Sequence, residues 1–234
     1  MVLVPLGLLI NLSYHIWLWH RVRTQPFLTI FGIDVHGRSL WISSMIKDIE
    51  KKNIVAVQSI RNMIMGSSIM ANTSILLCCG LGALISSNYT LKKPPIYSSS
   101  IYGAHGELAF ILKYAILFTL FLFSFLFHTL SIRFFNQLTI LISTPQQNDI
   151  INSNVTCIVT IQYLNELMRK ANILGILGNR VFHMGLPLLL WIFGPVMAFS
   201  CSLAMVVLFH KLDFVDRNNK EEIKMGIDLE NGMV

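Results

Sequence analysis

The chain has 234 residues, of which 54% are hydrophobic and only 13% are charged. About a quarter of the residues of a soluble domain are charged, so this composition excludes an ordinary soluble globule and predicts a polytopic membrane protein. The formal net charge of +6 does not predict nucleic-acid binding, because the Lys and Arg residues stand beside apolar runs. There they indicate topology and contact anionic lipid headgroups.

Four apolar runs are long enough to cross a hydrocarbon layer about 30 Å thick, and each predicts a transmembrane helix. They cover residues 2–19, 62–86, 114–132 and 181–209. The last run is long enough to be tilted or kinked. Eleven Lys and Arg in the two long loops, against seven on the other side, favour loops in the cytosol and both termini outside.

Both long loops contain apolar residues at helical spacing, in residues 38–52 and, less cleanly, in 153–174. Such patterns predict amphipathic helices that lie in the membrane interface. The fold class is therefore an all-α integral membrane protein, with a four-span transmembrane helix bundle in residues 1–210 and interfacial amphipathic helices in the two cytosolic loops. The charged tail, residues 211–234, has little apolar surface to bury and is predicted to be disordered.

The second span, from Arg61 to Ser86, is predicted to be the central helix of the bundle. Asn72 stands near its middle, where lipid tails offer an amide no partner, so this side chain is expected to face another helix. Small residues at helical spacing also allow close approach of a second backbone, within the chain or in a homo-oligomer. The predicted packing residues are Ser67, Ala71, Asn72, Ser74, Cys78 and Gly82.

Cationic and polar residues gather at the cytosolic mouths of three spans. They are Arg61, Asn62, Arg133, Arg180 and His183. Together they could form a basic vestibule in which arginines bind an anionic substrate or a lipid headgroup. Alternatively, each arginine reaches toward headgroups and marks the membrane boundary. The sequence leaves both interpretations open.

Three histidines, His15, His128 and His183, are expected at similar depth. Imidazoles in such an arrangement could hold a metal or haem, or relay protons, but hydrogen bonds to a neighbouring helix or a lipid headgroup are the favoured explanation. The spans contain no pair of histidines at metal-ligand spacing and no carboxylate, and the chain has no nucleophile motif. We therefore predict no metal, no cofactor and no enzymatic activity.

The fourth span contains Pro187 and Pro195. A proline inside a helix frees a backbone carbonyl one turn earlier, and broken helices form substrate sites in some transporters. Proline is also common in membrane helices, where it produces a packing kink. Both residues are predicted to kink the fourth span.

Several segments resemble a known family. They include Tyr14-His15-x-Trp17-Leu18, Gly37-Arg38-x-x-Trp41-Ile42, Ala56-Val57-Gln58-x-x-Arg61-Asn62 and Trp191-x-Phe193-Gly194-Pro195. Their combination is similar to the plant members of the membrane family known as domain of unknown function 599. The resemblance covers roughly residues 2–210. It implies a multi-pass membrane protein, and it implies no activity and no catalytic residues.

Two functions from different classes follow from these residues. The first is a small oligomeric transporter or channel whose site is the basic vestibule. The second is a non-enzymatic membrane scaffold or lipid-interacting protein, and a haem or metal oxidoreductase is a distant third. The expected location is the plasma membrane or an endomembrane, and the expected partners are the lipid bilayer and a second copy of the chain, with no nucleic acid.

Overall fold

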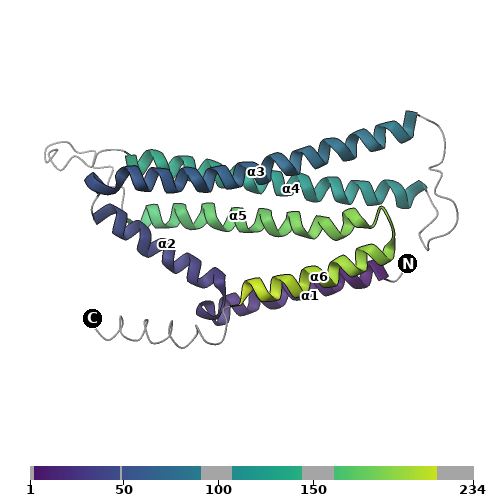
Figure 1. Cartoon of the computed structure of the whole chain (residues 1–234), viewed down its shortest axis with the longest axis horizontal. Coiled ribbons are helices and arrows are strands. Elements are labelled where there is room, and N and C mark those ends of the chain that lie inside the picture. Colours follow the sequence, from purple (N-terminus) through teal and green to yellow (C-terminus); the bar gives the residue numbers. More distant parts are fainter. Residues whose placement is uncertain (1–2, 48, 91–106, 144–160, 215–234) are drawn as a thin grey trace.

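Figure 1 shows a computed structural model of the chain, which describes residues 3–47, 49–90, 107–143 and 161–214. Its α-helices are α1 (Leu3–Thr24), α2 (Ile30–Lys47), α3 (Ile49–Thr90), α4 (Glu107–Ser143), α5 (Ile161–Leu190) and α6 (Pro195–Asp213). A single 3-10 turn, η1 (Pro26–Leu28), joins α1 to α2. Within the described ranges the fold is all-α, because the only strand-like pairing is one bridge between Thr29 and Phe214.

The helices form an elongated bundle in which α4 packs between α3 and α5 (Figure 1). α1 and α6 pack against each other along the other side of α5. α2 leaves the end of this pair and crosses obliquely toward the beginning of α5 (Figure 1). The apolar core follows the same order, with Phe121 and Leu138 of α4 fully buried between their neighbours.

Four helices in the described ranges are long and apolar enough to cross a membrane. These candidate spans are Lys52–Ser87 in α3, Ile111–Ser143 in α4, Ile161–Leu190 in α5 and Pro195–Asp213 in α6. Their number equals the predicted number, but they are not the same four segments. α1, which contains the predicted span 2–19, falls outside this set because Asn11, Tyr14 and His15 dilute its apolar residues.

The predicted single span 181–209 is wrong, because the structure divides these residues between two antiparallel helices. α5 ends at Leu190, the hydrogen bond from Gly194 N to Leu190 O (3.3 Å) closes a turn, and α6 begins at Pro195. A proline in the first position of a helix loses nothing, because its missing N–H would have no partner there. Pro195 therefore starts a helix and does not kink one, while Pro187 lies inside α5, which continues to Leu190.

The two predicted loop helices also need correction. Residues 38–52 are shared between α2 and the start of α3, and residues 161–174 form the first half of α5. Both segments belong to the bundle, since Ile42 of α2 and Leu167 of α5 are buried in one apolar cluster. Residues 153–160 and 215–234 lie outside the described residues, so the disorder predicted for the tail is not tested there. Lys211 to Asp213 form the last turn of α6.

Three of the small residues that were predicted to pack on α3 are buried on the side that faces α4. Ala71, Ser74 and Cys78 are buried, the Ser74 hydroxyl lies 3.0 Å from that of Ser124, and the Cys78 thiol donates to a carbonyl of α4. Ser67 and Gly82 are half-buried. Asn72 differs from expectation, because its side chain is exposed on the opposite face of α3 and faces none of the described helices.

Candidate functional site

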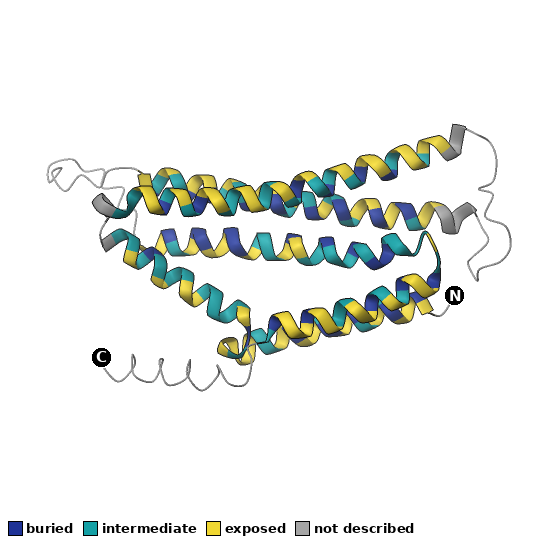
Figure 2. Ribbon diagram, in the orientation of Figure 1, coloured by how far each residue is buried: buried dark blue, intermediate teal, exposed yellow. Residues whose placement is uncertain are grey.

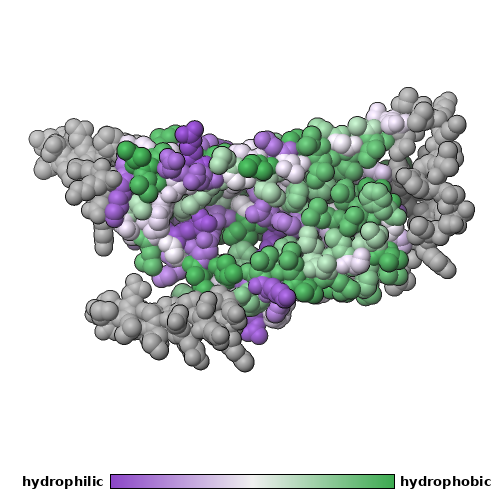
Figure 3. Space-filling model, viewed as in Figure 1, coloured by the Kyte–Doolittle hydropathy of each residue, from purple (hydrophilic) through white to green (hydrophobic). Residues whose placement is uncertain are grey.

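A cavity of about 330 Å³ lies where α2 crosses α3, α4 and α5. We call it the α2 cavity. It is lined by Ile30, Phe31, Asp34, Arg38, Met63, Gly66, Ser67, Met70, His128, Ser131, Phe135, Ala171, Asn172, Gly175, Ile176 and Asn179. Figure 3 shows that hydrophilic side chains gather on the α2 half of the molecule, whereas the other half is covered by apolar side chains. The cavity therefore lies near the boundary between a polar and an apolar part of the bundle.

An ion pair on α2 forms one wall of the cavity. Asp34 and Arg38 are four residues apart, so they occupy the same face of the helix. The Arg38 Nε donates to both carboxylate oxygens of Asp34, at 2.9 and 2.8 Å. Both side chains remain partly exposed, at 34% for Asp34 and 27% for Arg38.

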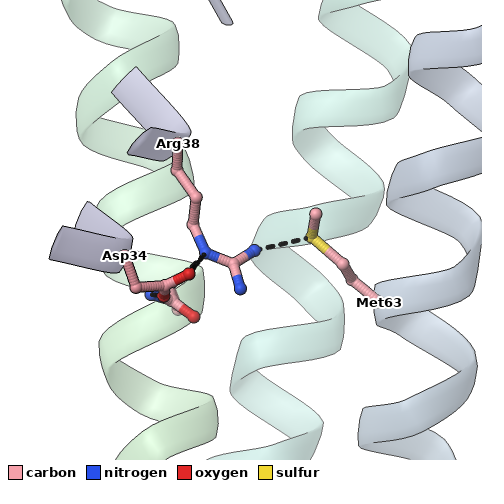
Figure 4. Close-up of polar contacts among 4 residues, drawn as sticks. Asp34, Arg38 and Met63 are labelled. Carbon is pink, nitrogen blue, oxygen red and sulfur yellow. Dashed lines mark hydrogen bonds and ion pairs between the residues drawn. The ribbon is translucent and has the colours of Figure 1, made fainter. Parts of the chain in front are cut away.

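This pair also connects α2 to two other helices. Asn172 of α5 donates through Nδ2 to the Asp34 Oδ2 at 2.7 Å. On the other side the Arg38 Nη1 lies 3.0 Å from the Met63 sulfur of α3, so the guanidinium extends across the front of α4 (Figure 4). The charges are held by side-chain contacts at the cavity wall, where a bound solute could compete for them.

His128 of α4 lines the α2 cavity and is 1% exposed, yet neither of its ring nitrogens has a hydrogen-bond partner within the described ranges. Its neighbours are satisfied, because Ser124 donates to Gly178 O at 3.1 Å and Ser131 donates to Ala171 O at 2.7 Å. Buried polar groups are nearly always paired with protein or water. A neutral imidazole offers one donor and one acceptor, so His128 has full capacity to bind water or a ligand.

Gly178 allows α5 to approach His128 this closely. A Cβ atom on Gly178 would lie 2.7 Å from the His128 Nε2, which is shorter than any van der Waals contact. The glycine therefore fixes the position of the imidazole against α5, and any larger residue would displace the ring or α5.

A second polar cluster lies outside the cavity, where α1, α5 and α6 meet. The Tyr14 hydroxyl donates to the Asp213 carboxylate at 2.6 Å, and Arg180 forms an ion pair with the other carboxylate oxygen. The Arg180 guanidinium also lies over the rings of Phe31 (5.0 Å) and Phe209 (4.4 Å). Asp213 is 3% exposed, so this buried triad joins three helices.

The five residues of the predicted vestibule do not come together. Arg61, Asn62 and Arg133 have exposed side chains, and none of them lines the cavity. Arg180 is engaged by Asp213, and the His183 Nδ1 pairs with the Asn179 carbonyl of its own helix. The vestibule as predicted needs correction, because Arg61, Asn62 and Arg133 face outward whereas Arg180 turns to the junction of α1, α5 and α6.

Two of the predicted vestibule residues are close in sequence to residues that line the cavity. Arg133 lies between the lining residues Ser131 and Phe135, and Arg61 comes two residues before Met63.

The three histidines that were predicted at similar depth have different surroundings. His15 and His183 each contact the ring of Phe209, whereas His128 lines the cavity. The part of the chain that the structure describes brings no three His, Cys, Asp or Glu residues into a metal-binding group.

The residues that sequence reasoning missed are Asp34, Arg38 and Asn172. Asp34 was expected in a loop, but it lies on α2. One signal was available, since a carboxylate four residues before an arginine is the spacing of a helical ion pair. No signal near Asn172 indicated its contact with Asp34, because the two residues are 138 positions apart.

Within the described residues, the helices and the site define a class, a helical bundle with four candidate membrane spans and a cavity that α2 and three of these spans line. A family model described as "Protein of unknown function, DUF599" matches residues 2–218, and the chain belongs to this family. The match confirms the resemblance seen in the sequence motifs. No curated protein and no solved structure matches the chain.

Proposed function

We propose that the chain crosses the membrane five times, with α1 as the fifth span beside the four candidate spans. α1 has 22 residues, which at 1.5 Å per residue make it about 33 Å long, enough for a hydrocarbon core. α1, α3, α4, α5 and α6 run in alternating directions along the bundle (Figure 1). An odd number of crossings places the two termini on opposite sides, in contrast to the four-span prediction.

The distribution of basic residues supports this topology. In the sequence, Lys92 and Lys93 stand in the connection between α3 and α4, and Lys113 stands near the start of α4. In the order of the sequence, the other fifteen of the 18 Lys and Arg residues belong to the connections and helix segments of the opposite side, or follow the start of the last turn of α6. Cytosolic segments carry an excess of Lys and Arg, and fifteen against three is a much larger excess than the four-span count of eleven against seven.

Reporters of membrane sidedness test the five-span topology. A reporter placed after Asp213 and another placed at Gln25 are expected on the cytosolic face, and a reporter placed before Leu3 on the opposite face. The readout is protease or thiol-reagent access in sealed vesicles. If the reporters before Leu3 and after Asp213 lie on the same face, the five-span topology is wrong and the four-span prediction stands.

The α2 cavity binds a small polar solute of no net charge, and this binding is the first step of transport across the membrane. The observation that carries this function is a cavity whose walls hold charges of both signs and a buried histidine without a partner. Its volume lies at the lower end of the about 300–1,000 Å³ typical of ligand sites. A zwitterion such as an amino acid fits this chemistry, with an ammonium group on Asp34 and a carboxylate on Arg38.

A second function, recognition of a lipid headgroup by a membrane scaffold, is favoured by one observation. Ile30, Phe31, Met63 and Met70 line the same cavity as the ion pair. An amphipathic ligand could place a zwitterionic headgroup on Asp34 and Arg38 and lay its chain along these apolar side chains. The same variants test both functions.

Uptake into vesicles reconstituted with the full chain is the test, with a mixture of labelled neutral amino acids as the probe. Arg38→Met is expected to lower uptake about 10- to 100-fold, because one charge-assisted hydrogen bond to a carboxylate contributes about 1.5–3 kcal/mol. Arg133→Met is the matched control, since it removes an exposed arginine at the same level that does not line the cavity. Equal elution volumes and thermal midpoints show that both variants fold.

Other outcomes contradict the transport function in distinct ways. Loss of uptake in Arg133→Met alone would return the site to the vestibule predicted from the sequence. No uptake by any variant, together with a phospholipid that co-purifies with the wild type and is lost from Arg38→Met, would identify the lipid-binding function.

A further inference from the structure

α3 carries a second row of residues on the face that α4 does not cover. It consists of Met65, Ile69, Asn72, Leu76, Cys79 and Ala83, all of them exposed, and we call it the outer seam. Figure 2 shows exposed positions recurring along α3. The spacing alternates between four and three residues, as in the seam of a left-handed pair of helices. Ile69 and Leu76 are 60% and 71% exposed, which is far more than their counterparts on the α4 side.

Asn72 lies in the middle of the outer seam and near the centre of the candidate span Lys52–Ser87. Its amide is exposed and makes no hydrogen bond to any residue that the structure describes. Lipid tails cannot satisfy an amide, so polar side chains at this depth bond across helix interfaces. The helices that the structure describes leave Asn72 without such a partner.

We propose that a second copy of this chain covers the outer seam, with the two α3 helices parallel and the two Asn72 amides hydrogen-bonded to each other. Copies in one bilayer share an orientation, so a two-fold axis along the membrane normal brings identical residues together at equal depth. An amide carries both donors and acceptors and is therefore complementary to itself. The proposal rests on membrane insertion of α3 and is independent of the α2 cavity.

The seam residues around Asn72 fit this partner. A single polar residue in an otherwise apolar seam fixes the register and the number of helices, because any shift leaves the amide unpaired. Met65, Ile69 and Leu76 supply the apolar contacts on either side, and Ala83 allows the two helices to approach closely at one end. The opposite row on α3, which contains Ala71 and Ser74, is already occupied by α4.

Energy transfer between labelled copies of the full chain, measured in lipid vesicles over a range of protein-to-lipid ratios, tests the dimer. Asn72→Leu keeps the seam apolar but removes the amide, and it is expected to weaken association about 3- to 30-fold. Asn72→Gln keeps an amide and is expected to retain most of the association. Thr73→Val is the matched control, because the Thr73 hydroxyl bonds to the Ile69 carbonyl of its own helix at 2.8 Å.

Two adjacent cysteines give a second, independent readout. Cys79 lies exposed on the outer seam, whereas Cys78 is buried against α4. In a Cys157→Ser background, copper phenanthroline under air is expected to join the two Cys79 thiols of a dimer, with two electrons and two protons passing to oxygen. Cys79→Ser should abolish the cross-linked dimer, and Cys78→Ser should leave it unchanged.

The results that overturn the proposal are specific. They are a monomer at every protein-to-lipid ratio, equal association of Asn72→Leu and the wild type, or cross-linking that persists in Cys79→Ser through Cys201 of α6. None of these outcomes bears on uptake through the α2 cavity, which is measured with other variants.

Discussion

Replacing Asp213 with alanine is expected to lower the free energy of unfolding by about 3–5 kcal/mol, the typical cost of removing one partner from a buried ion pair. The Arg180 side chain is only 14% exposed, so its charge would remain buried without a counter-ion. The Tyr14 hydroxyl would lose its acceptor at the same time. A titration with denaturing detergent measures the loss, and the thermal midpoint should fall on the order of 10 °C.

Two controls separate the ion pair from a general effect of mutation. The double variant Arg180→Met with Asp213→Leu should recover much of the lost stability, because apolar residues can replace a buried pair with little cost. Glu166→Ala removes one partner of the ion pair with Lys170, whose side chains are about half exposed, and should leave the midpoint unchanged. If Asp213→Ala is as stable as Glu166→Ala, the triad does not hold these helices together.

Gly32→Ala is expected to displace α2 and to disrupt the α2 cavity. A Cβ atom at this position would lie 2.1 Å from the Pro26 carbonyl oxygen, a backbone atom that cannot rotate away. The same oxygen accepts hydrogen bonds from the N–H and the hydroxyl of Thr29, at 3.1 and 2.8 Å. The cost should reach or exceed the about 1–3 kcal/mol of ordinary overpacking. Solute binding should fall with it, since Asp34 lies two residues further along α2.

Gly37→Ala is the matched control on the same helix. A Cβ atom there meets nothing within 4 Å, so alanine should stabilise α2 by up to about 1 kcal/mol through its better helix propensity. The thermal midpoint should therefore fall for Gly32→Ala and rise slightly for Gly37→Ala. Solute binding should differ sharply between the two variants, because only Gly32→Ala displaces α2. A Gly32→Ala protein as stable as Gly37→Ala would show that Pro26 and residue 32 can move apart at little cost.

The sequence predicts the local features of this fold well. Uncharged runs of sufficient length identify α3 and α4, because hydrophobic length is a property of contiguous residues. The family resemblance and the all-α class follow from similarly local patterns. At the site, the local signal was the four-residue spacing of Asp34 and Arg38, which is that of a helical ion pair.

The contacts between distant residues could not be predicted in this way. The Asp34 contact with Asn172 and the Tyr14 contact with Asp213 join positions 138 and 199 residues apart, and no spacing rule connects them. Asp213 follows an apolar run directly, so it was assigned to a charged tail. The break at 191–194 was hidden because the apolar character continues through the turn, and only Gly194-Pro195 indicated it.

The pairing of the first helix with the last has a consequence for how the protein is made. The Tyr14 hydroxyl finds its acceptor 199 residues later, so α1 leaves the ribosome long before α6 exists. During this interval the buried face of α1, which includes Asn11, has no permanent neighbour. A chain halted before α6 would keep that polar face unshielded in the bilayer, which would make truncated products recognisable to membrane proteases and chaperones.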